Sequence, residues 1–173
     1  MIKKIKFVSL LIIIFSCLYL IFFNLYSRYD VIIQNRIIDN AFSVGELPYD
    51  YLGYIDIPKF GIRRLIVHGT DKDVLDSLCV GMHDSSGDLF DSNLIILAGH
   101  NISNVFSKLH YIELGDDVFL RGKDIFRRFV VYDKKIVDEY DNSYFYNRSN
   151  ELVLITCMDY DGYRLLVFLR EVL

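Results

Sequence analysis

The stretch Leu152–Phe168, LVLITCMDYDGYRLLVF, decides the fold of this chain. Two apolar runs rich in strand-forming residues flank a short polar connection, which is the pattern of a β-hairpin. The first run ends at Thr156 and Cys157, and the second begins at Arg164. A hairpin with these ends brings a thiol and a guanidinium to the same rim of a sheet.

A third apolar run lies upstream and stops at a histidine. Residues Asn93–Asn101 read NLIILAGHN, and the uninterrupted run Leu94–Ala98 predicts a central strand buried on both faces. His100 then follows Gly99 at the end of that strand. A thiol, an imidazole and a guanidinium at three strand ends suit acyl transfer, with Cys157 as the nucleophile.

Six short motifs, taken together and in this order, resemble those of the sortases, the cysteine transpeptidases of Gram-positive cell surfaces. They are YIDIPK at 54–59, GMH at 81–83, LAGH at 97–100, LGD at 114–116, ITC at 155–157 and RLLV at 164–167. The resemblance runs from about Gly53 to the C-terminus. It does not assign a class, and class B-like and class D-like members both stay open.

The resemblance implies catalytic roles for the three strand-end residues. Cys157 would attack the scissile carbonyl of an LPXTG-like sorting signal, and Arg164 would stabilise the oxyanion. His100 would protonate the leaving amine and then deprotonate the incoming one. The rival candidates for the imidazole are His68, His83 and His110, and the rival for the guanidinium is Arg170.

The resemblance also implies a groove for the sorting signal, with Ala98, Ile155 and Thr156 beside the catalytic residues. The expected partners are surface proteins that carry a C-terminal sorting signal, and the amino group of a lipid II-like cell-wall precursor. Six residues separate Cys157 from Arg164, fewer than in many sortases.

Two other functions stay open on the residues alone. One is an anchored β-barrel that binds a partner or acts as a scaffold, with Cys157 buried or in a disulfide with Cys79. The other is a hydrolytic cysteine peptidase, in which water resolves the acyl-enzyme.

Outside the hairpin, short strand-like runs at regular spacing predict an antiparallel β-barrel or sandwich with one or two short helices. The resemblance narrows this to the eight-stranded barrel of sortases. Further strands are expected at residues 52–57, 65–68, 118–120, 126–132 and 135–138.

Helix and loop signals lie between these strands. A capping box at Thr70–Asp73 predicts the start of a helix that buries Val74, Leu75 and Leu78. The spacing of apolar residues over 105–109 predicts another helical turn, and Gly81–Asp91 has the composition of a polar loop.

The N-terminus has the pattern of a membrane anchor. Met1–Lys6 carries three lysines and no acid, and Phe7–Tyr26 has no charged residue. Twenty helical residues span roughly 30 Å, the thickness of a bilayer core, and the lysines favour a cytoplasmic N-terminus. An uncleaved anchor is preferred to a cleaved signal peptide because the apolar run is long and no small-residue cleavage pattern follows. The predicted division is a tip and anchor at 1–26, a stalk at 27–48 and an extracellular catalytic barrel at 49–173.

The charge of the exported part argues against nucleic acid as a partner. From Gly45 onward there are 14 Lys and Arg against 21 Asp and Glu, a net charge of −7, with no basic run. No Cys-x-x-Cys motif occurs, so neither a zinc site nor a thioredoxin-like site has support, and no cofactor is expected. Four acids are conceivable calcium ligands, but we interpret them as surface acids and predict no metal site. They are Asp116, Asp117, Asp138 and Glu139.

Overall fold

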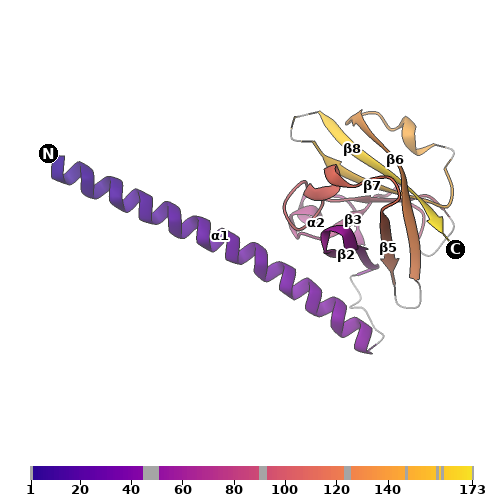
Figure 1. Ribbon diagram of the computed structural model, residues 1–173, viewed down its shortest axis with the longest axis horizontal. Coiled ribbons are helices and arrows are strands. Elements are labelled where there is room, and N and C mark those ends of the chain that lie inside the picture. The colour runs from indigo at the N-terminus through magenta and orange to yellow at the C-terminus, as the bar shows by residue number, and fades with distance from the viewer. Residues whose placement is uncertain are drawn as a thin grey trace. The chain divides into compact units, whose positions relative to one another are not determined.

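The computed structural model describes residues 2–44, 51–89, 93–122, 126–146, 148–158, 160 and 162–172 (Figure 1). The chain divides into two compact units, Met1–Ile33 and Gln34–Leu173.

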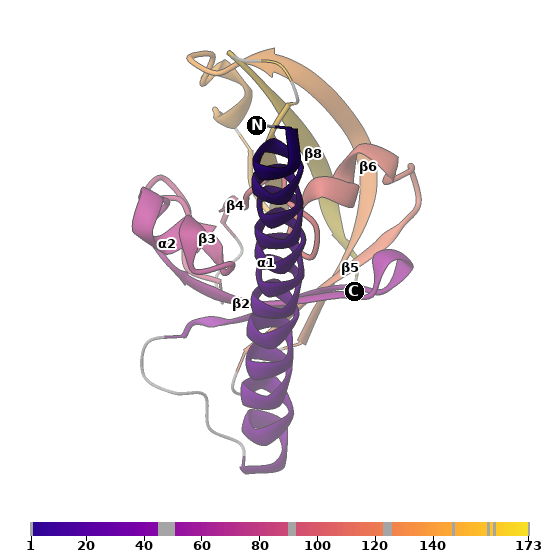
Figure 2. The ribbon, with the colours of Figure 1, turned by 90° about the vertical axis from the view of Figure 1, so that its left-hand side faces the viewer.

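Eight strands of the described residues close into a barrel in the second unit. They are β1 Gly53–Ile57, β2 Ile62–His68, β3 Val80–Met82, β4 Ile95–Ala98, β5 Asp117–Arg121, β6 Phe126–Asp138, β7 Glu151–Cys157 and β8 Tyr163–Val172. Around the barrel their order is β1-β2-β3-β4-β7-β8-β6-β5. The β2–β3 and β4–β7 pairs are parallel and the others are antiparallel; β6 and β8 run side by side in Figure 2. The predicted mainly β, eight-stranded barrel is confirmed.

Several predicted boundaries are wrong. The expected polar loop at Gly81–Asp91 begins inside β3, because Gly81 and Met82 pair with Val67 and His68 of β2. The two strands expected at 126–132 and 135–138 form one strand, β6, which continues through an irregularity between Val131 and Asp133. A bulge lets a strand bend without ending.

The helices between the strands are short and differ from the predicted ones. Helix α2 spans Lys72–Asp76 and has Asp71, not Thr70, at its N-cap, with no side-chain cap hydrogen bond. Leu78 lies beyond its end with a φ of 60°, so it does not extend the apolar face. Three further turns are 3-10 helices: η1 Pro58–Phe60, η2 Ser107–Tyr111 and η3 Ser143–Phe145.

Apolar side chains bury both faces of the sheet around β4 and β7. Ile95, Leu97 and Leu154 pack inside the barrel with the large central cluster. Ile96 and Val153 pack on the opposite face in a second cluster. Burying such a side chain contributes about 1.5–3 kcal/mol, so these two strands form a rigid support for whatever lies at their ends. The predicted burial of the 94–98 run on both faces is confirmed.

Helix α1 runs from Ile2 to Val44. Within the described residues it is the one helix long and apolar enough to cross a membrane, with a mean hydropathy of 2.5 over a segment inside Phe7–Ala41. A signal sequence near an N-terminus has the same properties. About 20 residues suffice to cross a bilayer core, so the predicted span Phe7–Tyr26 needs only part of this helix.

The last part of α1 belongs to the same compact unit as the barrel. Ile38 is completely buried in a cluster with Tyr54, Leu65 and Cys79. The side-chain amide of Gln34 donates to the carbonyls of Ser77 and Leu78, at 3.3 and 3.1 Å. Residues from Gln34 therefore help to hold the turn that follows α2.

Candidate active site

Strand register brings the ends of β4, β7 and β8 to the same level. Ala98 pairs with Ile155 across the parallel β4–β7 ladder, and Cys157 pairs with Arg164 across the antiparallel β7–β8 ladder. His100 follows Ala98 by two residues, as Cys157 follows Ile155. Because side chains alternate along a strand, this register places His100, Cys157 and Arg164 on the same side of the sheet.

Hydrogen bonds continue this alignment past the end of β4. The Gly99 amide donates to the Ile155 carbonyl at 3.0 Å, and the buried Thr156 hydroxyl donates to the Gly99 carbonyl at 2.9 Å. A Cβ at Gly99 would lie 2.7 Å from the Phe106 ring, so only glycine fits between the ring and the strand. The Phe106 amide in turn donates to the His100 carbonyl at 3.1 Å, which fixes the backbone of the histidine.

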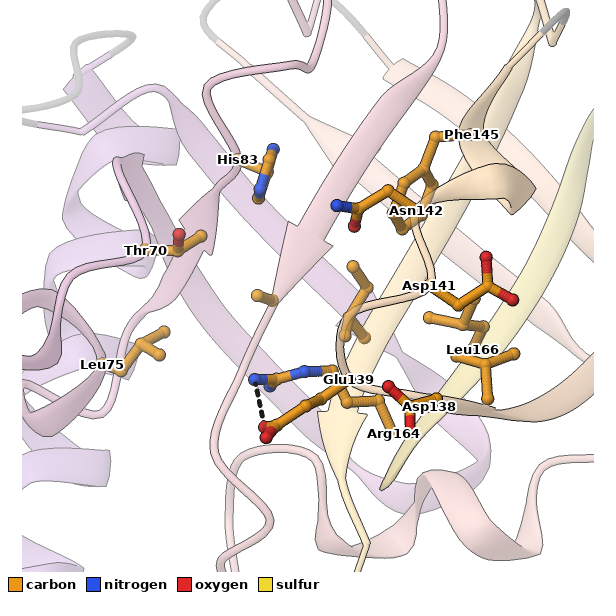
Figure 3. Close-up of a pocket in the computed structure, with 13 residues that line it drawn as sticks. Thr70, Leu75, His83, Asp138, Glu139, Asp141, Asn142, Phe145, Arg164 and Leu166 are labelled. Atoms are coloured by element: carbon orange, nitrogen blue, oxygen red, sulfur yellow. Dashed lines mark hydrogen bonds and ion pairs between the residues drawn. The ribbon is translucent and has the colours of Figure 1, made fainter. Parts of the chain in front are cut away.

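Arg164 contacts the cysteine sulfur directly. Its Nη1 donates to Cys157 Sγ at 3.6 Å, and Cys157 is exposed to solvent. A reactive cysteine needs both access and a neighbouring positive charge that suits its thiolate form. The second terminal nitrogen of the guanidinium, Nη2, lies 3.4 Å from Glu139 Oε2, the contact drawn as a dashed line in Figure 3.

His100 has its own carboxylate partner. Its Nε2 lies 3.1 Å from Asp76 Oδ1 at the end of α2, and the imidazole is partly exposed. The second oxygen of Asp76 accepts from Lys72 Nζ at 2.6 Å. Lys72 and, to a smaller extent, His100 hold the pKa of Asp76 below its usual range, so this carboxylate is ionised at neutral pH.

A cavity of about 290 Å³ opens next to these strand ends. Ala98 and Ile155 form part of its wall, together with Arg164 and Glu139. Figure 3 shows His83 and Phe145 on other parts of the wall. The wall thus joins apolar side chains to the guanidinium that contacts the cysteine.

Comparison with known proteins identifies the family of this chain. The profile of the sortase domain matches residues 55–172. The chain belongs to the sortase family. Members of this family are cysteine transpeptidases.

Individual sortases resemble the chain over most of the barrel. Sortase D of Bacillus subtilis (strain 168) is 33% identical over 107 residues, which cover 61% of this chain and 53% of that protein. The chain therefore spans about half the length of this curated relative. The crystal structure of sortase C1 from Streptococcus agalactiae has a TM-score of 0.65 and 29% identity, covering 72% of this chain and 69% of that one. Sortase C-1 from Actinomyces oris has a TM-score of 0.66 and 24% identity, covering 72% and 76% of the two chains, and shows the fold alone.

The predicted groove residues of this sortase separate into two groups. Ala98 and Ile155 line the cavity, and their contact with substrate stays a prediction. Thr156 is only 2% exposed, and its hydroxyl is bonded to the Gly99 carbonyl. Its side chain therefore ties β7 to the end of β4, and a role in substrate binding stays a prediction.

The two cysteines of the barrel unit have opposite surroundings. Cys79 is buried beside Ile38 and Leu65, and burial raises the pKa of its thiol. Cys157 is exposed at the end of β7. Both are free thiols, so the alternative Cys79–Cys157 disulfide is absent from the described chain.

The acids considered as calcium ligands lie in two separate places, near the start of β5 and at the end of β6. Asp116 contacts Lys59 at 2.8 Å, and Asp117 contacts Arg128 at 2.9 Å. Glu139 pairs with Arg164. Among the described residues, no three His, Cys, Asp or Glu side chains gather as metal ligands would.

Sequence reasoning missed Asp76, and it gave lesser roles to two other residues of the site, His83 as a weaker imidazole candidate and Glu139 as a surface acid. Asp76 and His83 come from segments between strands, and their approach to β4 depends on loop conformation that no local pattern encodes. Glu139 was considered only as a surface acid, yet it lines the cavity and contacts Arg164. Its position directly after β6, whose end pairs with the start of β8, is the signal that could have found it.

Proposed function

We propose that this sortase is a membrane-anchored cysteine transpeptidase that cleaves a sorting signal and joins the new carboxyl end to an amine. The observation that carries the proposal is the contact of Arg164 with the exposed sulfur of Cys157, at the level where register places His100. A nucleophile, a permanent cation and an imidazole on one rim are the groups that acyl transfer requires.

In the first half-reaction, the thiolate of Cys157 attacks the carbonyl carbon of the scissile peptide bond, while His100 carries the proton that it will donate. The carbonyl electrons move to oxygen, where the Arg164 guanidinium stabilises the negative charge. Collapse breaks the C–N bond and leaves a thioester, and His100 gives its proton to the departing amine. Because Ala98 and Ile155 form a wall next to this point, we assign them to contact the sorting signal.

In the second half-reaction, an amine attacks the thioester. His100 takes a proton from this amine, the tetrahedral intermediate collapses, and the C–S bond breaks to release Cys157 and a new amide. The acceptor we propose is the amino group of a lipid II-like cell-wall precursor, and the donors are surface proteins that carry a C-terminal sorting signal. If water replaces the amine, the same steps give hydrolysis.

We further propose a single-pass arrangement, with a cytoplasmic N-terminus and the catalytic barrel outside the cell. The lysines of Met1–Lys6 and the apolar run Phe7–Tyr26 support it. The division into 1–26, 27–48 and 49–173 follows the same proposal: anchor, stalk and catalytic domain.

The direct test is to trap the thioester. The purified chain is mixed with a panel of LPXTG-like peptides, and mass spectrometry locates the adduct. We expect an acyl group on Cys157, which an added amine converts to an amide product. Hydrolysis unaffected by any amine would identify a peptidase. The absence of an adduct, with Cys157 also inert to a methanethiosulfonate reagent, would favour a scaffold.

Arg164→Lys separates two roles for the guanidinium. Lysine keeps the charge but loses the planar pair of donors that reaches Sγ and Glu139 together. We expect kcat to fall on the order of 10²-fold with little change in KM, as when one oxyanion donor is removed. Steady-state kinetics with the best peptide measures both, and Arg170→Lys on the same strand is the control. A raised KM with unchanged kcat would show that Arg164 only binds the substrate.

A further inference from the structure

The imidazole of His100 is held by a carboxylate from another element. Asp76 Oδ1 lies 3.1 Å from His100 Nε2, and α2, which carries Asp76, is separated from β4 by β3 in the chain. An ionised carboxylate can only accept hydrogen bonds. Nε2 is therefore the protonated nitrogen in this contact, and Nδ1 is left to exchange protons with a reacting amine.

Helix stability does not account for an acid at position 76. Asp76 is the last residue of α2, where a negative charge opposes the helix dipole. Its ion pair with Lys72 has the basic residue on the N-terminal side, which is the weaker orientation of an i,i+4 pair. Its contact with His100 supplies a reason for its position that the helix itself does not.

The turn that follows Asp76 is held in place by hydrogen bonds to Gln34. Gln34 donates to the carbonyls of Ser77 and Leu78, and its own side-chain oxygen accepts from the Leu65 amide of β2 at 3.4 Å. These bonds run through the turn immediately after Asp76 to the wall of the barrel. The backbone next to Asp76 is thus fixed by these hydrogen bonds, and Lys72 donates to the second oxygen of its carboxylate.

We propose that Asp76 is a positioning residue for transpeptidation, which orients His100 by accepting a hydrogen bond from Nε2 and leaves Nδ1 to serve both half-reactions. This inference rests on the proposed function, because it assigns Asp76 to the acid–base step of that chemistry. Asp76 acts through His100 and touches neither substrate nor sulfur.

Asp76→Ala and Asp76→Asn test the role together. Alanine removes the acceptor, so we expect kcat to fall about tenfold with KM held, at the lower end of the cost of losing a histidine's supporting partner. Asparagine keeps an acceptor oxygen, so most of the activity should return. Asp73→Ala, an exposed acid on the same helix, should match the wild type. In a His100→Ala background, Asp76→Ala should add nothing.

Several kinetic results would overturn the proposal. They are an unchanged kcat in Asp76→Ala, an equal loss in Asp76→Asn, or a further loss in the His100→Ala background. Melting temperatures of all variants, together with the rate at which a methanethiosulfonate reagent labels Cys157, should stay at wild-type values. A drop in kcat that follows a drop in melting temperature would mean that Asp76 only supports the fold.

A second measurement does not depend on turnover. The Asp76 carboxyl is titrated by carbon NMR in the wild type and in His100→Gln. Because Lys72 and then His100 lower the pKa of Asp76, that pKa should move upward in the variant. An unchanged titration would refute the contact itself. A wild type that turns over no peptide would end the proposed function and the positioning role, while the titration would still decide whether the two side chains pair.

Discussion

Replacing Cys157 by alanine is expected to abolish the thioester and to lower turnover by a factor on the order of 10⁴ or more, as for other enzymes that lose their nucleophile. Every proposed step uses the sulfur, first as the attacking atom and then as the leaving group. The side chain is exposed and is not part of either apolar cluster of the sheet, so its loss should leave the barrel intact. The cavity wall is also unchanged, and peptide affinity should stay near that of the wild type.

Mass spectrometry of trapped adducts and equilibrium binding of a labelled peptide measure the two parts of this prediction. Cys79→Ala is the matched control, because that thiol is buried in a different cluster, beside Ile38. Its activity per folded molecule should equal that of the wild type. Wild-type turnover by the Cys157→Ala protein would remove the whole mechanism.

Replacing His100 by alanine should lower kcat on the order of 10²- to 10⁴-fold, the range for a lost general acid–base group. Both half-reactions should suffer, since one needs a proton donor and the other a proton acceptor. Single-turnover experiments separate them: thioester formation is followed after mixing with peptide, and its decay after adding amine.

His83→Ala is the control for the choice of imidazole. His83 lines the cavity, and its Nδ1 accepts from the Ser85 amide at 3.1 Å. It precedes β4, whereas His100 lies at the end that register aligns with Cys157. We expect His83→Ala to change KM more than kcat. Equal losses of kcat in folded His83→Ala and His100→Ala proteins would mean that the wrong histidine was chosen.

The parts of the fold that the sequence predicts well are those with strong local patterns. The run 94–98 is apolar without interruption because β4 is buried on both faces, and the hairpin ends at Cys157 and Arg164 in the structure as in the pattern. Strand β3 escaped detection because it has only three residues, too few for a periodic pattern. It is held by parallel pairing with β2, a contact between segments that no local periodicity reports.

The residues of the candidate site also differ in how well the sequence predicts them. Cys157, His100 and Arg164 stand at strand ends, which local patterns indicate, and the register of β4, β7 and β8 places these ends at one level. Asp76 and Glu139 approach them from outside those strands, and an exposed acid next to a turn looks like any other solvated acid in sequence. Thr156 shows the opposite difficulty: a residue next to the nucleophile is easily assigned to the substrate, whereas its hydroxyl joins two strands.

The contacts of Gln34 and Ile38 bear on which part of the chain is the smallest complete folding unit. A soluble fragment cut at residue 45 retains Cys157, His100 and Arg164, yet it leaves Tyr54 and Leu65 without the side chain that covers them. The burial of Ile38 alone contributes about 2 kcal/mol. Such a fragment also lacks the side-chain amide of Gln34, which donates hydrogen bonds to the turn after Asp76. Rates measured on this fragment would describe a barrel that lacks the contacts of Gln34 and Ile38. A fragment that begins before Gln34 is therefore the appropriate soluble enzyme for kinetic work.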